Sequence, residues 1–233
     1  APARDEIIHK RWRLPLVQKF WRANRVDRSE FGVERPKLGI VTAGKAYGDV
    51  MQALKHLGID AARARQLGID IYKVGMIWPL EPEGLREFAQ DCEELFFIEE
   101  KSAFMEPQAA ALFYNDARRP RIVGKADESG AAMLPSDTLL EPIPVALAIA
   151  SRLQRNGMAD EDIEQRRAAA QSMRQALLPV ADESPKRLPF FCSGCPHNTS
   201  TNVPDGSIAI AGIGCHGMAM WAKPGTTLLG TQM

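Results

Sequence analysis

The feature that most constrains the fold is a regular alternation of short apolar runs and helical patterns in the middle of the chain. Four apolar runs have the length of buried strands, at residues 38–42, 69–74, 95–98 and 121–123. Helices are predicted between and after them, at residues 47–57, 83–92, 105–114 and 142–156. Strands separated by helices of about 10–15 residues specify a mostly parallel sheet with helices on both faces. The sequence therefore predicts an α/β domain over residues 37–157.

The segment before this domain, residues 1–36, has an amphipathic pattern. Ile8, Trp12, Leu16 and Phe20 recur at roughly helical spacing among many basic residues. This pattern predicts a helix that is broken or bent at Pro15, because proline lacks the N–H that a helix interior requires. We expect the helix to pack on a neighbouring domain rather than to bind nucleic acid or lipid.

The segment after the domain is charged and then rich in proline. Residues 160–178 predict a solvated helix or linker, and residues 179–189 predict an extended connector. We assign residues 158–189 to this helix and linker, with a domain boundary near residue 180. Residues 190–233 would then form the start of a second domain.

Composition narrows the class of protein. The 233 residues are 45% hydrophobic and 25% charged, and their net charge is zero, so no overall charge favours binding to nucleic acid or an acidic membrane. The longest apolar runs, residues 144–150 and 208–213, are shorter than the roughly 20 residues of a membrane-spanning helix. The cysteines are clustered like ligands rather than scattered like a disulfide framework, so we expect a cytoplasmic protein. The missing initiator methionine leads us to expect a piece of a longer polypeptide.

Three of the four cysteines and two of the four histidines gather near the carboxyl end of the chain. Cys192 and Cys195 form a CxxC motif that continues as Pro-His197, and the pair Cys215-His216 follows Cys195 after nineteen intervening residues. Thiolates are the soft ligands that zinc and iron–sulfur clusters require, and a two-residue spacer lets both cysteines of one turn reach one metal centre.

The spacing leaves several interpretations of these cysteines open. A zinc ion would need His197 or His216 as its fourth ligand, whereas a four-iron cluster would need a further cysteine from outside this chain. The motif CSGC could instead be a tight glycine-containing turn with unligated thiols, or a disulfide or redox pair.

Two polar segments follow predicted strands, where open α/β sheets bind ligands. Residues 42–48 form a glycine-rich turn before a helix, but their order matches neither common phosphate-binding motif, which favours a turn that simply needs small residues. For Glu99, Glu100 and Lys101, a solvated strand end is favoured over ion pairs across a subunit interface or a substrate contact by Glu100. Cys92 is expected to be a small core residue within a helix.

Several segments of the sequence resemble the indolepyruvate ferredoxin oxidoreductase family, which belongs to the thiamine-dependent 2-oxoacid:ferredoxin oxidoreductases. They are GIVTAGKAYGDVMQAL, VGMIWPLEPEGL, FFIEEKSAFMEPQ, RIVGKADESG and, as the most specific, FFCSGCPHNTSTNVPDGS and AIAGIGCH. The resemblance runs from about residue 38 onward. It implies a transketolase C-terminal-like α/β domain followed by the beginning of a thiamine diphosphate-binding α/β domain.

The resemblance also implies a reaction and its partners. The reaction is oxidative decarboxylation of an arylpyruvate such as indolepyruvate, with coenzyme A as the acyl acceptor and ferredoxin as the electron acceptor. The implied cofactors are thiamine diphosphate, Mg²⁺ and a [4Fe-4S] cluster, and the parent enzyme would be a homodimer. The fragment alone should be inactive. The alternatives are a non-catalytic subunit-packing module with a structural zinc knuckle, and a relative that acts on another 2-oxoacid.

Individual residues can be matched to this family. Cys192, Cys195 and Cys215 match positions that hold the four-iron cluster, whose fourth ligand would lie outside this chain. The GDGD-type segment that would hold Mg²⁺ and the diphosphate is not part of this chain. The residues implied to lie near thiamine diphosphate are His197, Gly214, Cys215 and His216, with a structural hydrogen bond as the alternative role of His197.

Overall fold

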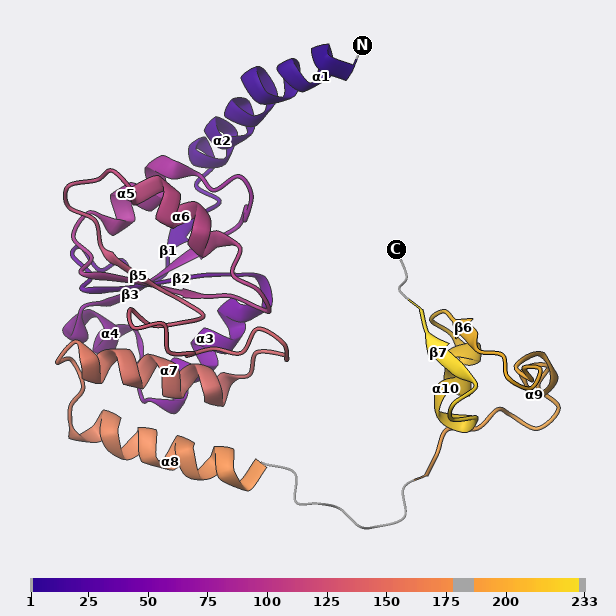
Figure 1. Ribbon diagram of the computed structural model, residues 1–233. Helices are drawn as coiled ribbons and strands as arrows, with labels where there is room; N and C mark the ends of the chain where they lie inside the picture. Colours follow the sequence, from indigo (N-terminus) through magenta and orange to yellow (C-terminus); the bar gives the residue numbers. More distant parts are fainter. Residues whose placement is uncertain (1, 178–186, 231–233) are drawn as a thin grey trace. The chain divides into compact units, whose positions relative to one another are not determined.

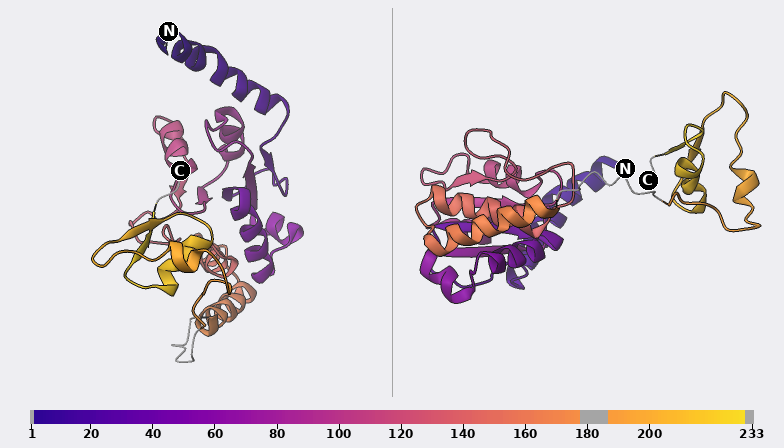
Figure 2. Two further views of the ribbon diagram at one scale, coloured as in Figure 1. Left: turned by 90° about the vertical axis from the view of Figure 1, so that its right-hand side faces the viewer. Right: turned by 90° about the horizontal axis from the view of Figure 1, so that it is seen from below.

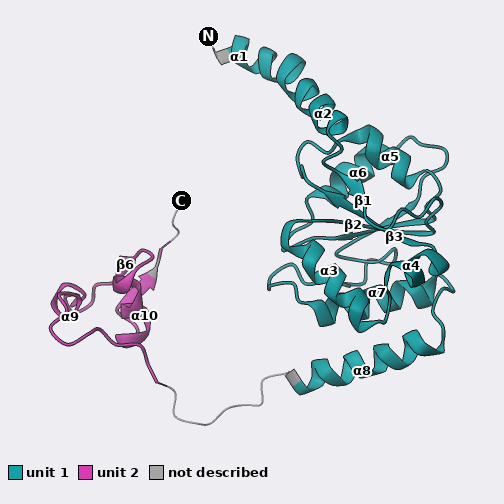
Figure 3. Ribbon diagram, turned by 180° about the vertical axis from the view of Figure 1, so that it is seen from behind, with its two compact units in different colours: residues 1–178 teal, residues 179–233 magenta. Residues whose placement is uncertain are grey.

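In a computed structural model, residues 2–177 and 187–230 of the chain are described. They belong to two compact units, residues 1–178 and residues 179–233 (Figure 3). Most of the connector predicted at residues 179–189 lies outside the described residues.

Unit 1 is built around a five-stranded sheet with the strand order β1-β3-β2-β4-β5. Strands β2 to β5 pair in parallel, and β1 pairs antiparallel with β3 at one edge (Figure 1). The mostly parallel sheet that the sequence predicts is therefore confirmed. The strands are β1 (Arg28–Ser29), β2 (Leu38–Ala43), β3 (Ile69–Val74), β4 (Glu94–Ile98) and β5 (Arg121–Val123).

Helices cover both faces of this sheet (Figure 1). One face carries α3 (Gly44–His56), α4 (Ala61–Leu67) and α7 (Pro142–Arg155), and the other carries α5 (Pro82–Ala89) and α6 (Met105–Phe113). Helix α8 (Glu161–Leu177) lies against α7 as an outer layer (Figure 2). This arrangement explains why β2, β3 and β4 are mainly apolar and buried, because a parallel sheet covered on both faces exposes neither side to water.

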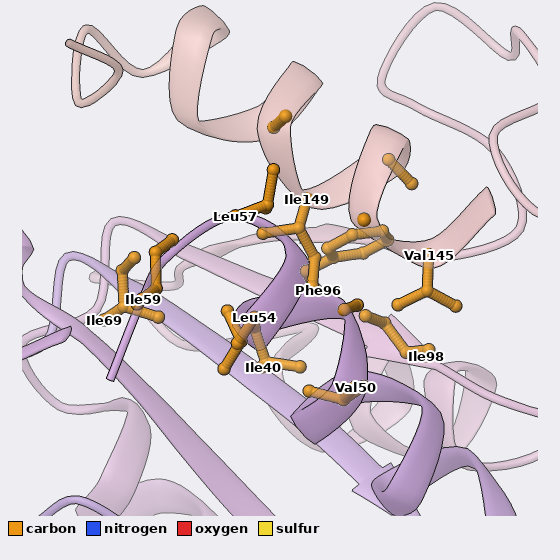
Figure 4. Packing of buried hydrophobic residues seen from close by; sticks show 14 of the residues in the cluster. Ile40, Val50, Leu54, Leu57, Ile59, Ile69, Phe96, Ile98, Val145 and Ile149 are labelled. Carbon is orange, nitrogen blue, oxygen red and sulfur yellow. The ribbon is translucent and has the colours of Figure 1, made fainter. Parts of the chain in front are cut away.

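Alternate residues of β2, β3 and β4 enter two separate cores. The larger core combines β2 and β4 with helices α3 and α7, and its members include Ile40, Leu54, Phe96, Ile98 and Ile149 (Figure 4). The smaller core lies under α5 and α6, and its members include Val41, Leu85, Leu95, Phe97 and Met105.

Two elements of unit 1 were not predicted from the sequence. Helix α4 is capped by Asp60, which precedes it and whose carboxylate accepts the N–H of Arg63 at 2.8 Å. Strand β1 has only two residues, and the loop that follows it is held by the buried carboxylate of Asp70. Asp70 accepts the backbone N–H groups of Phe31 and Val33, both at 2.9 Å. These contacts span 37 and 39 residues, so no local pattern could indicate them.

Other predicted elements are found with changed bounds or surroundings. Helix α3 starts at Gly44 instead of residue 47, and α5 ends at Ala89, so Cys92 follows this helix instead of lying within it. Residues 160–178 were predicted to be a solvated helix or a linker, and the structure has the helix. Helix α8 buries Ile163 and Ala170, while most of its charged side chains are exposed.

The amino-terminal segment is a helix in three parts: α1 (Pro2–Ile8), the π-helical turn η1 (His9–Arg13) and α2 (Leu14–Ala23). The π-helical turn ends two residues before Pro15, which is consistent with the proline ring clashing with a carbonyl of the preceding turn. Arg22 joins this helix to the start of α5 through ion pairs with Glu81 and Glu83. Among the described residues, no helix is long and apolar enough to cross a membrane.

Unit 2 contains a small βαβ arrangement. Its elements are α9 (His197–Ser200), β6 (Ala209–Ala211), η2 (Cys215–Met218), α10 (Ala219–Ala222) and β7 (Thr227–Leu229). Strands β6 and β7 pair in parallel, and η2 and α10 form the connection between them.

Candidate functional site

The predicted site residues come from two segments of unit 2. Residues 192–197 precede and begin α9, whereas Gly214, Cys215 and His216 follow two residues after the end of β6. The carboxyl ends of strands are where open α/β sheets bind ligands, because the loops there diverge and leave backbone groups free. Gly214, Cys215 and His216 therefore lie at the carboxyl end of a strand, where a cofactor site is expected.

The CxxC motif forms a tight turn. The N–H of Cys195 donates to the carbonyl of Cys192 at 3.0 Å, and Gly194 at its centre has φ +73°, a conformation that suits glycine. The side-chain amide of Asn198 donates to the same carbonyl at 3.2 Å. Cys192 is exposed and Cys195 is half-buried. Part of the turn is thus fixed by hydrogen bonds that involve no metal.

His197 lies beside the second cysteine of this turn. Its Nδ1 is 3.2 Å from Sγ of Cys195, and its ring is nearly parallel to that of Phe191, with 5.5 Å between the ring centroids. Phe191 is buried, so it provides a fixed surface for the histidine ring. The imidazole is therefore held by stacking on one side and by the thiol at Nδ1.

His216 fixes the loop that follows β6. Its Nε2 accepts the N–H of Gly212 at 3.0 Å, so a neutral His216 carries its proton on Nδ1. Gly214 has φ +140°, which strains any residue with a side chain, and a Cβ there would lie 3.4 Å from the His216 ring. The rings of His197 and His216 are nearly parallel, with 6.3 Å between their centroids. The fold thus brings Cys195, His197 and His216 together.

The three cysteines predicted to bind the cluster, Cys192, Cys195 and Cys215, do not form a preassembled metal site. Cys215 is exposed, and the described part of the chain contains no group of three His, Cys, Asp or Glu side chains close enough to hold a metal ion. The three thiols fit an iron–sulfur cluster in their chemistry, but the described residues do not arrange them as a ready-made site.

Lys223, which the sequence analysis did not single out, connects the two segments of the site. It follows α10, and its ammonium donates to three oxygens in and just after α9: the Asn198 carbonyl at 3.3 Å, the Thr201 hydroxyl at 3.1 Å and the Asn202 side chain at 2.5 Å. The sequence offers no local signal for this role, because the partners lie 21 to 25 residues away.

The polar segments of unit 1 have structural roles. Glu99 is buried and accepts three backbone N–H groups at the start of α6, so the prediction of a solvated strand end was wrong for this residue. Glu100 accepts the N–H of Leu140 at 3.0 Å and pairs with Lys45, and both interactions lower the pKa of the Glu100 carboxyl. Lys45 also binds Asp49 at 2.8 Å, which raises the Lys45 pKa. These groups stabilise loops of unit 1.

Cys92 is a core residue, as predicted. It is 8% exposed in the smaller core of unit 1, and burial raises the pKa of its thiol to about 12. Two cavities of about 740 Å³ also lie in unit 1, one beside Arg22 and Tyr72 and the other beside Leu147 and Arg174. Neither is lined by a residue of the cysteine–histidine site.

Known proteins similar to this chain point to one family. The model of the indolepyruvate oxidoreductase domain matches residues 28–177. Subunit IorA of indolepyruvate oxidoreductase from Methanothermobacter marburgensis is 27% identical over 83% of this chain and 26% of its own length. The subunit of the same name from Pyrococcus abyssi is 25% identical over 85% of this chain and 28% of its own length.

The solved structure of 2-oxoglutarate:ferredoxin oxidoreductase from Magnetococcus marinus, with 2-oxoglutarate, coenzyme A and succinyl-CoA bound, is also similar. Its identity is 18% and its TM-score 0.38, over 70% of this chain and 24% of that chain. The chain spans about a quarter of the length of the curated relatives it matches. Because the domain model covers more than half of the residues, the chain belongs to the indolepyruvate oxidoreductase family.

Proposed function

We propose that this chain is part of a cytoplasmic enzyme that oxidatively decarboxylates a 2-oxoacid, with indolepyruvate or another arylpyruvate as substrate. Coenzyme A would accept the acyl group and ferredoxin the electrons, and the parent enzyme would be a homodimer. The observation that carries this proposal is the match of the indolepyruvate oxidoreductase domain to residues 28–177. By itself the chain would be inactive, since it spans about a quarter of the relatives' length.

Unit 2 would contribute residues to two cofactor sites. Cys192, Cys195 and Cys215 would bind a [4Fe-4S] cluster, with a fourth ligand from outside this chain. Thiamine diphosphate, held with Mg²⁺ by residues outside this chain, supplies the carbanion chemistry that decarboxylation of a 2-oxoacid requires. The residues proposed to line its pocket are His197, Gly214, Cys215 and His216.

The chain's own residues would orient and shape this pocket. The Gly212 N–H holds Nε2 of His216, so this histidine keeps the glycine-rich loop after β6 in place. Gly214 lets the backbone approach a ligand closely, because it carries no Cβ and its φ of +140° suits glycine. The stacked Phe191, His197 and His216 rings would form one wall.

The test uses the full-length gene product purified without oxygen. We expect about four irons and four acid-labile sulfides per site, lost in Cys192→Ser, together with ferredoxin reduction that requires both indolepyruvate and coenzyme A. Turnover on pyruvate instead of indolepyruvate would assign another 2-oxoacid as substrate. Absence of both the cluster and any 2-oxoacid turnover would contradict the proposal.

A structural zinc site is the second candidate for these residues. The observation that favours it is the contact between Sγ of Cys195 and Nδ1 of His197, since zinc binds mixed sulfur and nitrogen ligands. The chain would then be a non-catalytic module, in which the α/β domain of unit 1 is a platform for subunit packing and unit 2 carries the zinc. One zinc per chain without sulfide, in the same metal analysis, would support this alternative.

A further inference from the structure

Lys223 connects the two segments of the proposed site, residues 192–197 and residues 214–216, through hydrogen bonds. Its side chain is half-buried, and its ammonium reaches Asn198, Thr201 and Asn202 from a position beyond α10. An ammonium has three N–H donors and no acceptor, so these three oxygens match its full donor set. Hydrogen bonds from a charged group contribute more than those between neutral groups.

Two of the three partners lead directly to the predicted site residues. Thr201 receives one Lys223 hydrogen bond at its hydroxyl and donates that hydroxyl to the carbonyl of His197. Asn198 receives another at its carbonyl, and its side-chain amide donates to the carbonyl of Cys192. The carbonyl of Cys195 accepts the backbone N–H of Asn198 at 3.0 Å, so Cys192, Cys195 and His197 each lie one hydrogen bond away from a Lys223 partner.

Lys223 is also attached to the other segment. Its backbone N–H donates to the carbonyl of Ala219 at 2.8 Å, at the end of the short helix that continues from η2. Helix η2 begins at Cys215 and contains His216. A single side chain therefore connects the helix after Cys215 and His216 with the helix that begins at His197.

We propose that Lys223 is the positioning residue of this site: it holds the segment with Cys192, Cys195 and His197 in register with the segment that contains Cys215 and His216. This inference rests on the proposed function for the identity of what is bound there. The positioning itself depends only on the hydrogen bonds of unit 2. Without Lys223, the short helix α9 would lose its connection to α10, and the two segments would separate more easily.

The test compares Lys223→Met and Lys223→Arg in the full-length protein purified without oxygen. Methionine keeps an unbranched apolar side chain but removes the donors, whereas arginine retains charge and donors. Lys55→Met, at an exposed position of α3 in unit 1, is the matched control. Hydrogen–deuterium exchange is measured for peptides that cover residues 197–202 and residues 209–211, and iron and sulfide are measured in parallel.

We expect Lys223→Met to speed amide exchange in residues 197–202 about tenfold or more, as the loss of hydrogen bonds from a charged group predicts. Exchange in β6 should change much less, and Lys223→Arg should restore most of the protection. Iron and sulfide should fall in Lys223→Met and stay at the wild-type level in Lys55→Met.

Two outcomes would overturn the inference. Unchanged exchange in residues 197–202 would show that Lys223 does not hold this segment, and an equal increase throughout unit 2 would show that it stabilises the unit as a whole. Absence of iron and sulfide from the wild-type protein would instead count against the proposed cluster, while the exchange measurement would still decide whether Lys223 positions the segment.

Discussion

Glu94 and Arg152 form a bidentate ion pair in the interior of unit 1. Nε of Arg152 lies 2.8 Å from Oε1 of Glu94, and Nη2 lies 2.5 Å from Oε2. Neither residue is more than 3% exposed. The pair joins the first residue of β4 to helix α7, and Arg121 of β5 adds a further contact to Glu94 at 3.0 Å. This arrangement fixes the helix that closes the larger core.

Arg152→Met should destabilise the chain by about 3–5 kcal/mol, because it leaves the Glu94 carboxylate buried without its main partner. The control is Arg155→Met, which removes a more exposed ion pair with Glu128 and should cost at most about 1 kcal/mol. Urea unfolding of the 233-residue chain, followed by circular dichroism, measures both. Equal effects of the two substitutions would contradict the role given to the buried pair.

Glu99→Gln should destabilise the chain by about 1–3 kcal/mol. The Glu99 carboxylate accepts the N–H groups of Phe104, Met105 and Glu106 at 2.7–3.1 Å, and an amide offers only one acceptor oxygen for them. Glu141→Gln is the matched control: Glu141 precedes α7, is exposed and makes no side-chain capping hydrogen bond. The same urea titration applies, and a Glu99 variant as stable as the Glu141 variant would rule out this capping role.

The sequence predicted the parallel sheet because each of its four parallel strands is a distinct apolar run, and most of the helices between them have a helical pattern of their own. Glu99 was mispredicted because three consecutive charged residues suggest a solvated strand end. Its actual partners are backbone N–H groups at the start of α6, which reach Glu99 only in the folded chain. Lys223 was missed for the same reason, since its partners lie across a helix and a strand. The cysteine and histidine motifs indicated the candidate site residues of unit 2, but not which of their side chains are in contact.

The four cysteines should differ sharply in reactivity toward iodoacetamide at pH 8 in the metal-free chain. Cys192 and Cys215 are exposed, so both should be alkylated readily. The buried Cys92, with a pKa of about 12, has roughly one thiol in ten thousand as reactive thiolate at this pH. Peptide mass spectrometry should find Cys92 unmodified until urea is added. Alkylation of Cys92 at the rate of Cys192 would be incompatible with its place in the core.

Stability should fall as the pH rises above 9, in part because of Cys92. In the unfolded chain its thiol loses the proton near the ordinary pKa of 9.0, whereas in the folded chain burial keeps it protonated up to about pH 12. The unfolded state then binds fewer protons, so this group costs about 1 kcal/mol between pH 9 and pH 10 and nothing well below pH 9. Urea unfolding with a reductant should show a shallower decline for Cys92→Ala. Parallel pH profiles for both proteins would exclude this linkage.

Gly39 and Gly48 should respond in opposite directions to alanine. A Cβ at Gly39, the second residue of β2, would lie 2.6 Å from a ring carbon of Phe88 and 2.9 Å from a methyl carbon of Leu95. Both neighbours belong to a packed core, so Gly39→Ala should cost about 1–3 kcal/mol. Gly48 lies in α3 with no heavy atom within 4 Å of an added Cβ, so Gly48→Ala should stabilise the chain by about 0.5–1 kcal/mol. Urea midpoints of the two variants test the pair together. If Gly48→Ala destabilised the chain as much as Gly39→Ala, the close contact with Phe88 would not explain the cost of the substitution at position 39.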